Sequence, residues 1–190
     1  MGQKRSSHPT SLPNVLTASR IAAAPLLAVA VLTGQEPLIA AAIVLFAALT
    51  DLFDGIVARA QGQLSELGAV LDPIADKIFV ISALFLLVAD GLLRGATVVA
   101  VLIIVWRELL ISGLRDYARF IGFPAPVSRL AKIKTAAQFA SLLLLYAARV
   151  PTRNSEMLAE AGDGLLWVAS GLTLYTGGNY LWHTWRQTWK

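Results

Sequence analysis

Long apolar stretches separated by short polar turns run along the whole chain. Each has about the 20 residues that a helix needs to cross the hydrocarbon core of a bilayer. Glycine, proline and charged residues separate the stretches, for example at 34–37, 122–124 and 151–160. This pattern predicts an all-α, polytopic integral membrane protein with six transmembrane helices. The expected spans are roughly 15–33, 37–58, 69–89, 95–118, 130–148 and 163–183.

Composition supports a bilayer rather than the alternative, a soluble helical bundle rich in alanine and leucine. Of the 190 residues 56% are hydrophobic and 15% are charged, whereas a soluble domain usually has about a quarter charged residues. No linker or low-complexity run divides the chain, so we expect residues 1–190 to form a single membrane domain. The absence of cysteine excludes disulfides, thiolate metal sites and a cysteine nucleophile.

The basic residues predict the orientation of the spans. Residues 1–12 are polar and basic and lack a signal-peptide cleavage pattern, so we expect a cytosolic tail. Positive residues favour the cytosolic side, so we expect both termini in the cytoplasm. We expect the basic excess to meet anionic lipid headgroups and phosphorylated substrates, not nucleic acid. The cytosolic basic residues are Lys4, Arg5, Arg59, Arg115, Arg119, Arg129, Lys132, Lys134, Arg186 and Lys190, and the opposite side has Arg94, Arg149 and Arg153.

Four aspartates, at 51, 54, 72 and 76, stand in otherwise apolar surroundings at the expected cytosolic ends of the second and third spans. Ionised carboxylates in such a setting are costly unless they are paired or bound to metal. At i, i+3 and i, i+4 spacing, with glycine and alanine between them, they form two facing stripes that predict one or two Mg²⁺ or Mn²⁺ ions. The alternatives are buried ion pairs with Arg59, Lys77 or Arg107, or the pathway of a cation transporter. A transporter predicts acidic residues on both sides of the membrane.

The full pattern over residues 51–76 is Asp-x2-Asp-Gly-x2-Ala-Arg-x8-Gly-x3-Asp-x3-Asp. It resembles the signature of the CDP-alcohol phosphotransferase family, membrane enzymes that move a phosphatidyl or similar group from a CDP-linked lipid to an alcohol. Segments 13–21, 106–115 and 128–138 are similar to those of bacterial phosphatidylglycerophosphate synthases. This resemblance implies a homodimer that converts CDP-diacylglycerol and glycerol 3-phosphate to phosphatidylglycerophosphate and CMP, in phospholipid biosynthesis. Other acceptors in the family would be inositol phosphate, serine or phosphatidylglycerol.

The resemblance also implies roles for individual residues. Asp51, Asp54 and Asp72 hold metal, and Asp76 is the general base and a further metal ligand. Asn14 and Thr17, one helical turn apart, have a nearly equal alternative role in capping the start of the first helix. The residues expected to bind the CDP-lipid are Asn14, Thr17, Gly55, Ala58, Arg59, Ser65 and Gly68.

An acceptor with its own phosphate needs basic residues beyond the metal site. Arg107 and Arg115 are eight residues apart and so share one face of the fourth span. Glu108 is expected to orient Arg107 or Arg115 by an ion pair. The alternative role of the lysines at the start of the fifth span is membrane anchoring. The residues expected to bind the acceptor phosphate are Arg107, Arg115, Lys132, Lys134 and Lys77.

Overall fold

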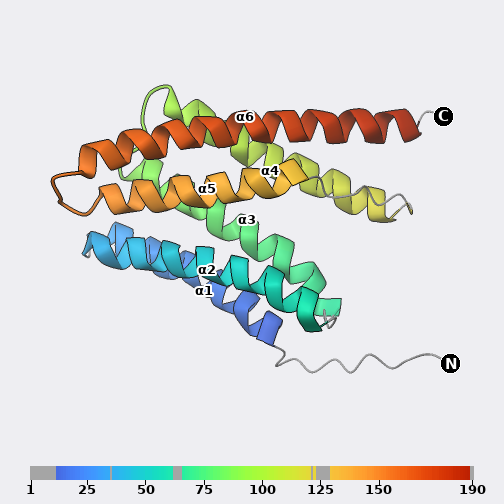
Figure 1. Ribbon diagram of the computed structural model, residues 1–190, viewed down its shortest axis with the longest axis horizontal. Coiled ribbons are helices and arrows are strands. Elements are labelled where there is room, and N and C mark those ends of the chain that lie inside the picture. The colour runs from blue at the N-terminus through green and yellow to red at the C-terminus, as the bar shows by residue number, and fades with distance from the viewer. Residues whose placement is uncertain (1–11, 35, 62–65, 121, 123–128, 189–190) are drawn as a thin grey trace. The chain divides into compact units, whose positions relative to one another are not determined.

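The computed structural model describes residues 12–34, 36–61, 66–120, 122 and 129–188. These ranges form six helices and contain no strand (Figure 1), which confirms the predicted all-α class. The helices are α1 (Leu12–Leu32), α2 (Pro37–Gln61), α3 (Glu66–Ala89), α4 (Thr97–Phe120), α5 (Arg129–Ala148) and α6 (Ser155–Thr188).

Glycines in the left-handed region end two of the helices where the sequence predicted turns. Gly34 has φ 64° and follows α1, and its N–H donates to the Val31 carbonyl at 3.2 Å. Gly91 has φ 76° and follows α3, and its N–H donates to the Val88 carbonyl at 3.1 Å. A side chain would be strained at such a φ, whereas glycine adopts it freely.

The last helix begins earlier than the sequence predicted. The sequence predicts a turn over residues 151–160, but α6 starts at Ser155 and runs for 34 residues. The Ser155 hydroxyl accepts a hydrogen bond from the Thr152 N–H at 2.9 Å, and Glu156 supplies a negative charge in the first turn. A helix of this length extends for about 50 Å, more than the about 30 Å of a hydrocarbon core. The polar residues therefore lengthen the helix instead of interrupting it.

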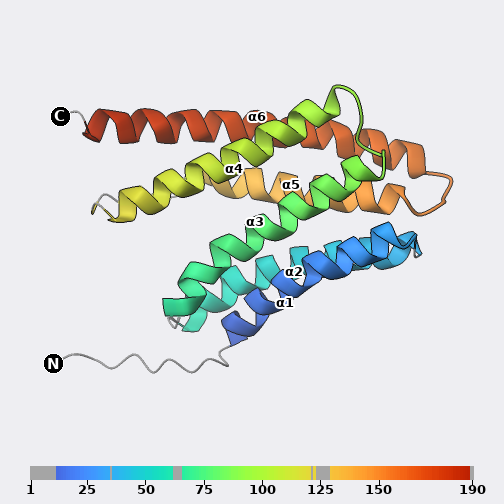
Figure 2. The same ribbon diagram turned by 180° about the vertical axis from the view of Figure 1, so that it is seen from behind.

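The chain divides into two compact units, Met1–Leu86 and Leu87–Lys190. In the first unit α1 packs along α2 (Figure 1, Figure 2). Much of the contact is made by alanine, which lets helix backbones approach closely in a membrane. Buried apolar residues of these two helices include Ala23, Ala24, Leu27, Ala30, Ala40, Val44 and Ala47.

In the second unit α4 and α5 each pack against α6. The α5–α6 contact is close at Gly162, where a Cβ atom would lie 2.8 Å from Cγ of Leu145. Ser141 of α5 donates a hydrogen bond to the Gly162 carbonyl at 2.7 Å. Asp90 and Arg149 form a two-pronged ion pair, with both nitrogen–oxygen distances at 2.9 Å.

Polarity is distributed as expected for a protein in an apolar solvent. Large apolar side chains are exposed, such as Trp106 at 67% and Leu32 at 71%, whereas Arg20, Lys134 and Thr173 are buried. Within the described ranges, Val15–Leu32 and Thr97–Arg115 are long and apolar enough to cross a bilayer. These observations support a membrane protein, and the number of spans stays a prediction.

Candidate functional site

The first polar cluster lies in the first unit and is centred on Arg20 of α1. We call Arg20, Asp51 and Asp76 the Arg20 cluster. Arg20 is 2% exposed, and its Nη1 lies 3.1 Å from Oδ1 of Asp51 on α2 and 3.7 Å from Oδ1 of Asp76 on α3. Three helices thus contribute one charged group each. A buried guanidinium requires anionic partners of this kind.

The Arg20 cluster brings together two of the four predicted metal ligands. Both carboxylates approach the same nitrogen atom of Arg20, so the structure brings these two predicted ligands to one site. Carboxylate oxygens are the donors that Mg²⁺ and Mn²⁺ prefer, so the donor set fits the predicted ions. Asp54 and Asp72 lie one turn away along α2 and α3, but their side chains are outside the described residues. Among the side chains that are described, no three histidines, cysteines, aspartates or glutamates form a group suited to a metal.

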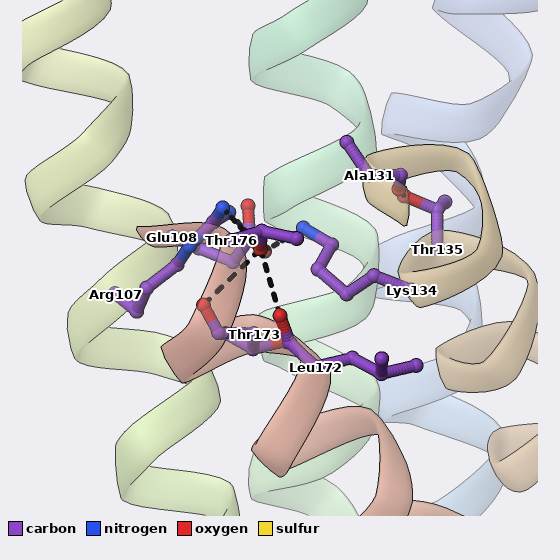
Figure 3. Close-up of polar contacts among 8 residues, drawn as sticks. All are labelled: Arg107, Glu108, Ala131, Lys134, Thr135, Leu172, Thr173 and Thr176. Carbon is purple, nitrogen blue, oxygen red and sulfur yellow. Dashed lines mark hydrogen bonds and ion pairs between the residues drawn. The ribbon is translucent and has the colours of Figure 1, made fainter. Parts of the chain in front are cut away.

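The second polar cluster lies in the second unit and contains Arg107, Glu108, Lys134 and Thr176; we call it the Glu108 cluster (Figure 3). Glu108 of α4 pairs with Lys134 of α5, and its Oε1 lies 3.4 Å from Nη1 of Arg107. Arg107 donates from Nη2 to the hydroxyl of Thr176 on α6 at 2.8 Å. Glu108 therefore has Arg107 as a partner, one of the two arginines predicted to pair with it.

The two lysines predicted at the start of α5 have different surroundings. Lys134 is 5% exposed and points to Glu108, whereas Lys132 is exposed. Among the described residues, Glu108 forms ion pairs with Arg107 and Lys134 and not with Arg115. The guanidinium carbon of Arg115 instead lies 5.8 Å from the ring centre of Tyr180. Lys77 belongs to α3 in the first unit and is partly exposed.

Most of the residues expected to bind the CDP-lipid lie outside the described side chains. Thr17 is the exception: it is fully buried on α1, one turn before Arg20. Ser65 is outside the described residues altogether. For five others the structure describes the helical backbone alone; these are Asn14, Gly55, Ala58, Arg59 and Gly68.

Comparison with known proteins identifies the family. The sequence model of the family described as CDP-alcohol phosphatidyltransferase matches residues 10–175. The chain belongs to this family. A CDP-diacylglycerol–glycerol-3-phosphate 3-phosphatidyltransferase of Rickettsia bellii is 35% identical over 90% of this chain and 93% of its own length. The protein of that name from Pectobacterium atrosepticum is 36% identical over 90% of this chain and 93% of its own length. An Arabidopsis thaliana protein of that name, numbered 2, is 35% identical over 95% and 82%.

Membership of the CDP-alcohol phosphatidyltransferase family confirms the resemblance read from the aspartate motif and makes the chain an enzyme, a transferase. Two residues of the clusters, Arg20 and Thr176, were not predicted from the sequence as site residues. Arg20 offered a signal, because an arginine inside an apolar stretch requires an anionic partner. Thr176 offered none, since a threonine in an apolar helix usually bonds its own backbone.

Proposed function

We propose that the chain is a metal-dependent CDP-diacylglycerol–glycerol-3-phosphate 3-phosphatidyltransferase. A hydroxyl oxygen of glycerol 3-phosphate bonds to the phosphorus that carries the diacylglycerol, and the bond from that phosphorus to CMP breaks. The observation that carries this proposal is the approach of Asp51 and Asp76, from separate helices, to one point in the structure. It is supported by relatives of this name that are 35–36% identical over 90% or more of the chain.

Asp51, Asp54, Asp72 and Asp76 are the proposed ligands of Mg²⁺ or Mn²⁺, and we expect two ions. Bound divalent ions would neutralise the pyrophosphate and stabilise the departing CMP. Arg20 joins α1 to the carboxylate-bearing helices and so holds Asp51 and Asp76 near each other.

Asp76 is the proposed general base, taking the proton from the attacking hydroxyl onto its carboxylate. Its side chain is 33% exposed, so a substrate can reach it. Thr17 stays a proposed residue of the CDP-lipid site; because its side chain is fully buried beside Arg20 on α1, we expect it to support the nucleotide-binding residues and not to touch the nucleotide. The other residues proposed to form the CDP-lipid site are Asn14, Gly55, Ala58, Arg59, Ser65 and Gly68.

The Glu108 cluster is proposed to contribute to binding of the acceptor phosphate. Arg107 and Lys134 are largely buried cations on different helices, and a phosphate is a preferred partner for such groups. Arg115, two turns after Arg107 on α4, is proposed to add a third cation. Lys77 and Lys132 remain proposed outer contacts of the phosphate. A phosphorylated acceptor is therefore favoured over serine.

We further propose six membrane spans with the active site at the cytosolic face, cytoplasmic termini, a bacterial inner-membrane location and a homodimer. Outward apolar side chains on α1, α2, α4 and α6 support contact with lipid. The basic segments of the sequence support the orientation.

The test is release of CMP by purified protein in lipid nanodiscs that contain CDP-diacylglycerol. Glycerol 3-phosphate, inositol phosphate, serine and phosphatidylglycerol are each supplied as the acceptor, with Mg²⁺, with Mn²⁺ or with EDTA. We expect fast release only with glycerol 3-phosphate and a divalent ion. Equal rates in EDTA would refute metal dependence, and preference for another acceptor would refute the substrate assignment.

A further inference from the structure

Thr176 of α6 is oriented to accept a hydrogen bond from Arg107. Its hydroxyl lies 2.8 Å from the carbonyl oxygen of Leu172 one turn earlier, to which it donates its proton. Because a hydroxyl has one proton, its lone pairs remain for Arg107 Nη2, also at 2.8 Å. Thr176 is 8% exposed, so little water competes for this bond.

Gly177, the next residue of α6, leaves the space in which the Arg107 side chain lies. A Cβ atom at 177 would be 3.0 Å from both Cγ and Nε of Arg107. At Gly178 a Cβ atom would meet nothing within 4 Å. Two consecutive glycines thus differ sharply: the first borders an arginine, and the second faces open space.

Tyr180 places a ring beside the second arginine of α4. The guanidinium carbon of Arg115 is 5.8 Å from the centre of this ring, within the range of a cation–π contact. Residues 176, 177 and 180 share one face of α6, and we call them the α6 stripe. Within the described part of the chain, Nε of Arg107 and Nε of Arg115 are buried without a hydrogen-bond partner.

We propose that the α6 stripe positions Arg107 and Arg115 to bind the phosphate of the acceptor. Thr176 holds one end of the Arg107 guanidinium, Glu108 attracts the other end, and Gly177 fixes the path of the side chain between them. Tyr180 holds Arg115 at the corresponding place two turns along α4. The buried Nε–H groups are donors of the kind that phosphate oxygens accept. This inference rests on the proposed role of the arginines in acceptor binding.

The decisive comparison is Gly177→Ala against Gly178→Ala, because both substitutions make the same change in the same helix. We expect Gly177→Ala to raise KM for glycerol 3-phosphate about tenfold, the effect of weakening one bond to a charged group. KM for CDP-diacylglycerol should stay within about twofold, since the crowding acts on Arg107 alone. Gly178→Ala should leave both constants unchanged. Calorimetric titration of glycerol 3-phosphate into each purified variant should reproduce the difference in affinity.

A second pair of variants, at Thr176, tests the same proposal even if Gly177→Ala fails to fold. Thr176→Val removes the acceptor while it keeps the shape, and Thr176→Ser keeps the hydroxyl. We expect a KM for glycerol 3-phosphate about tenfold higher in the valine variant than in the serine variant. Tyr180→Leu should raise this KM about threefold, and Tyr180→Phe should not.

Arg107→Ala and Arg115→Ala distinguish a failure of the proposed acceptor site from a failure of the proposed role of the α6 stripe. If neither raises KM for glycerol 3-phosphate, the proposed acceptor site is wrong. Both arginine variants could raise this KM while Gly177→Ala equals Gly178→Ala and Thr176→Val equals Thr176→Ser in KM for glycerol 3-phosphate. The arginines would then bind phosphate without help from the α6 stripe, and this inference would be overturned.

Discussion

Each of the two units of the chain buries a charged cluster, and the signs of the charges in one cluster are the reverse of those in the other. In the Arg20 cluster a guanidinium stands between two carboxylates, Asp51 and Asp76. In the Glu108 cluster a carboxylate stands between a guanidinium and an ammonium, those of Arg107 and Lys134. Each cluster includes its own counter-charge, which stabilises the folded protein before a ligand binds. The charge in excess then indicates the ligand. Two carboxylates in the first cluster favour a cation, and two basic groups in the second cluster favour a phosphate.

The strongest test of the first cluster is Asp76→Asn. Loss of a general base should reduce CMP release about 10²-fold to 10⁴-fold, while binding of CDP-diacylglycerol changes little. The rate is measured at saturating substrates and nucleotide binding by calorimetry. Glu156→Gln, an exposed change in the first turn of α6, is the control and should keep full activity. An Asp76→Asn protein with more than a tenth of the normal rate would exclude the base role.

Arg20→Leu tests whether the counter-charge of the first cluster stabilises the fold. It leaves two carboxylates facing each other, and breaking a buried pair costs about 3 kcal/mol, less the screening of the partly exposed aspartates. Thermal unfolding in EDTA should occur at a markedly lower temperature than for the unmodified protein. Mn²⁺ should restore part of the loss, because it supplies the missing positive charge. Arg20→Lys is the matched control, and equal unfolding temperatures for lysine and leucine would contradict this account.

Lys134→Met and Lys132→Met sharpen the assignment of the second cluster. Lys134 is buried against Glu108 and Lys132 is exposed. A charged bond of about 1.5–3 kcal/mol predicts a rise of about tenfold to a hundredfold in KM for glycerol 3-phosphate at position 134. The rise at position 132 should be below about threefold. If the two variants had similar KM values for glycerol 3-phosphate, the buried lysine would not be the main phosphate contact.

The smallest effect is expected for an ion pair outside both clusters. Arg149→Leu breaks the pair with Asp90, which is 32% exposed, so the loss of stability should be about 1 kcal/mol or less. Both KM values should be unchanged. A change in either KM would mean that the two clusters are not the only charged groups that affect substrate binding.

Much of the fold could be predicted from the sequence because the signals are local. Long apolar runs define the helices, and Gly34 and Gly91 mark turns that need a positive φ. The start of α6 was predicted wrongly, because a polar segment inside a long helix has the same composition as a loop. Hydrogen bonds such as that from the Thr152 N–H to the Ser155 hydroxyl distinguish the two, and the composition of the segment does not reveal them.

The site was predictable in part. The spacing of Asp51 and Asp76 indicated a shared site, and the structure brings their side chains to one guanidinium. That Arg20 is their partner depends on the packing of three helices, which no local pattern reports. The same holds for Gly177, since a glycine in an apolar helix gives no sign of which side chain crosses it.

The separation of 31 residues between Arg20 and Asp51 has a consequence for biogenesis. The first hydrophobic segment therefore reaches the translocon before its neutralising carboxylate, which follows later in the chain, can join it. An isolated arginine makes partition of that segment into lipid unfavourable. We therefore expect the translocon to release α1 and α2 together as a helical hairpin, already paired, and not one after the other.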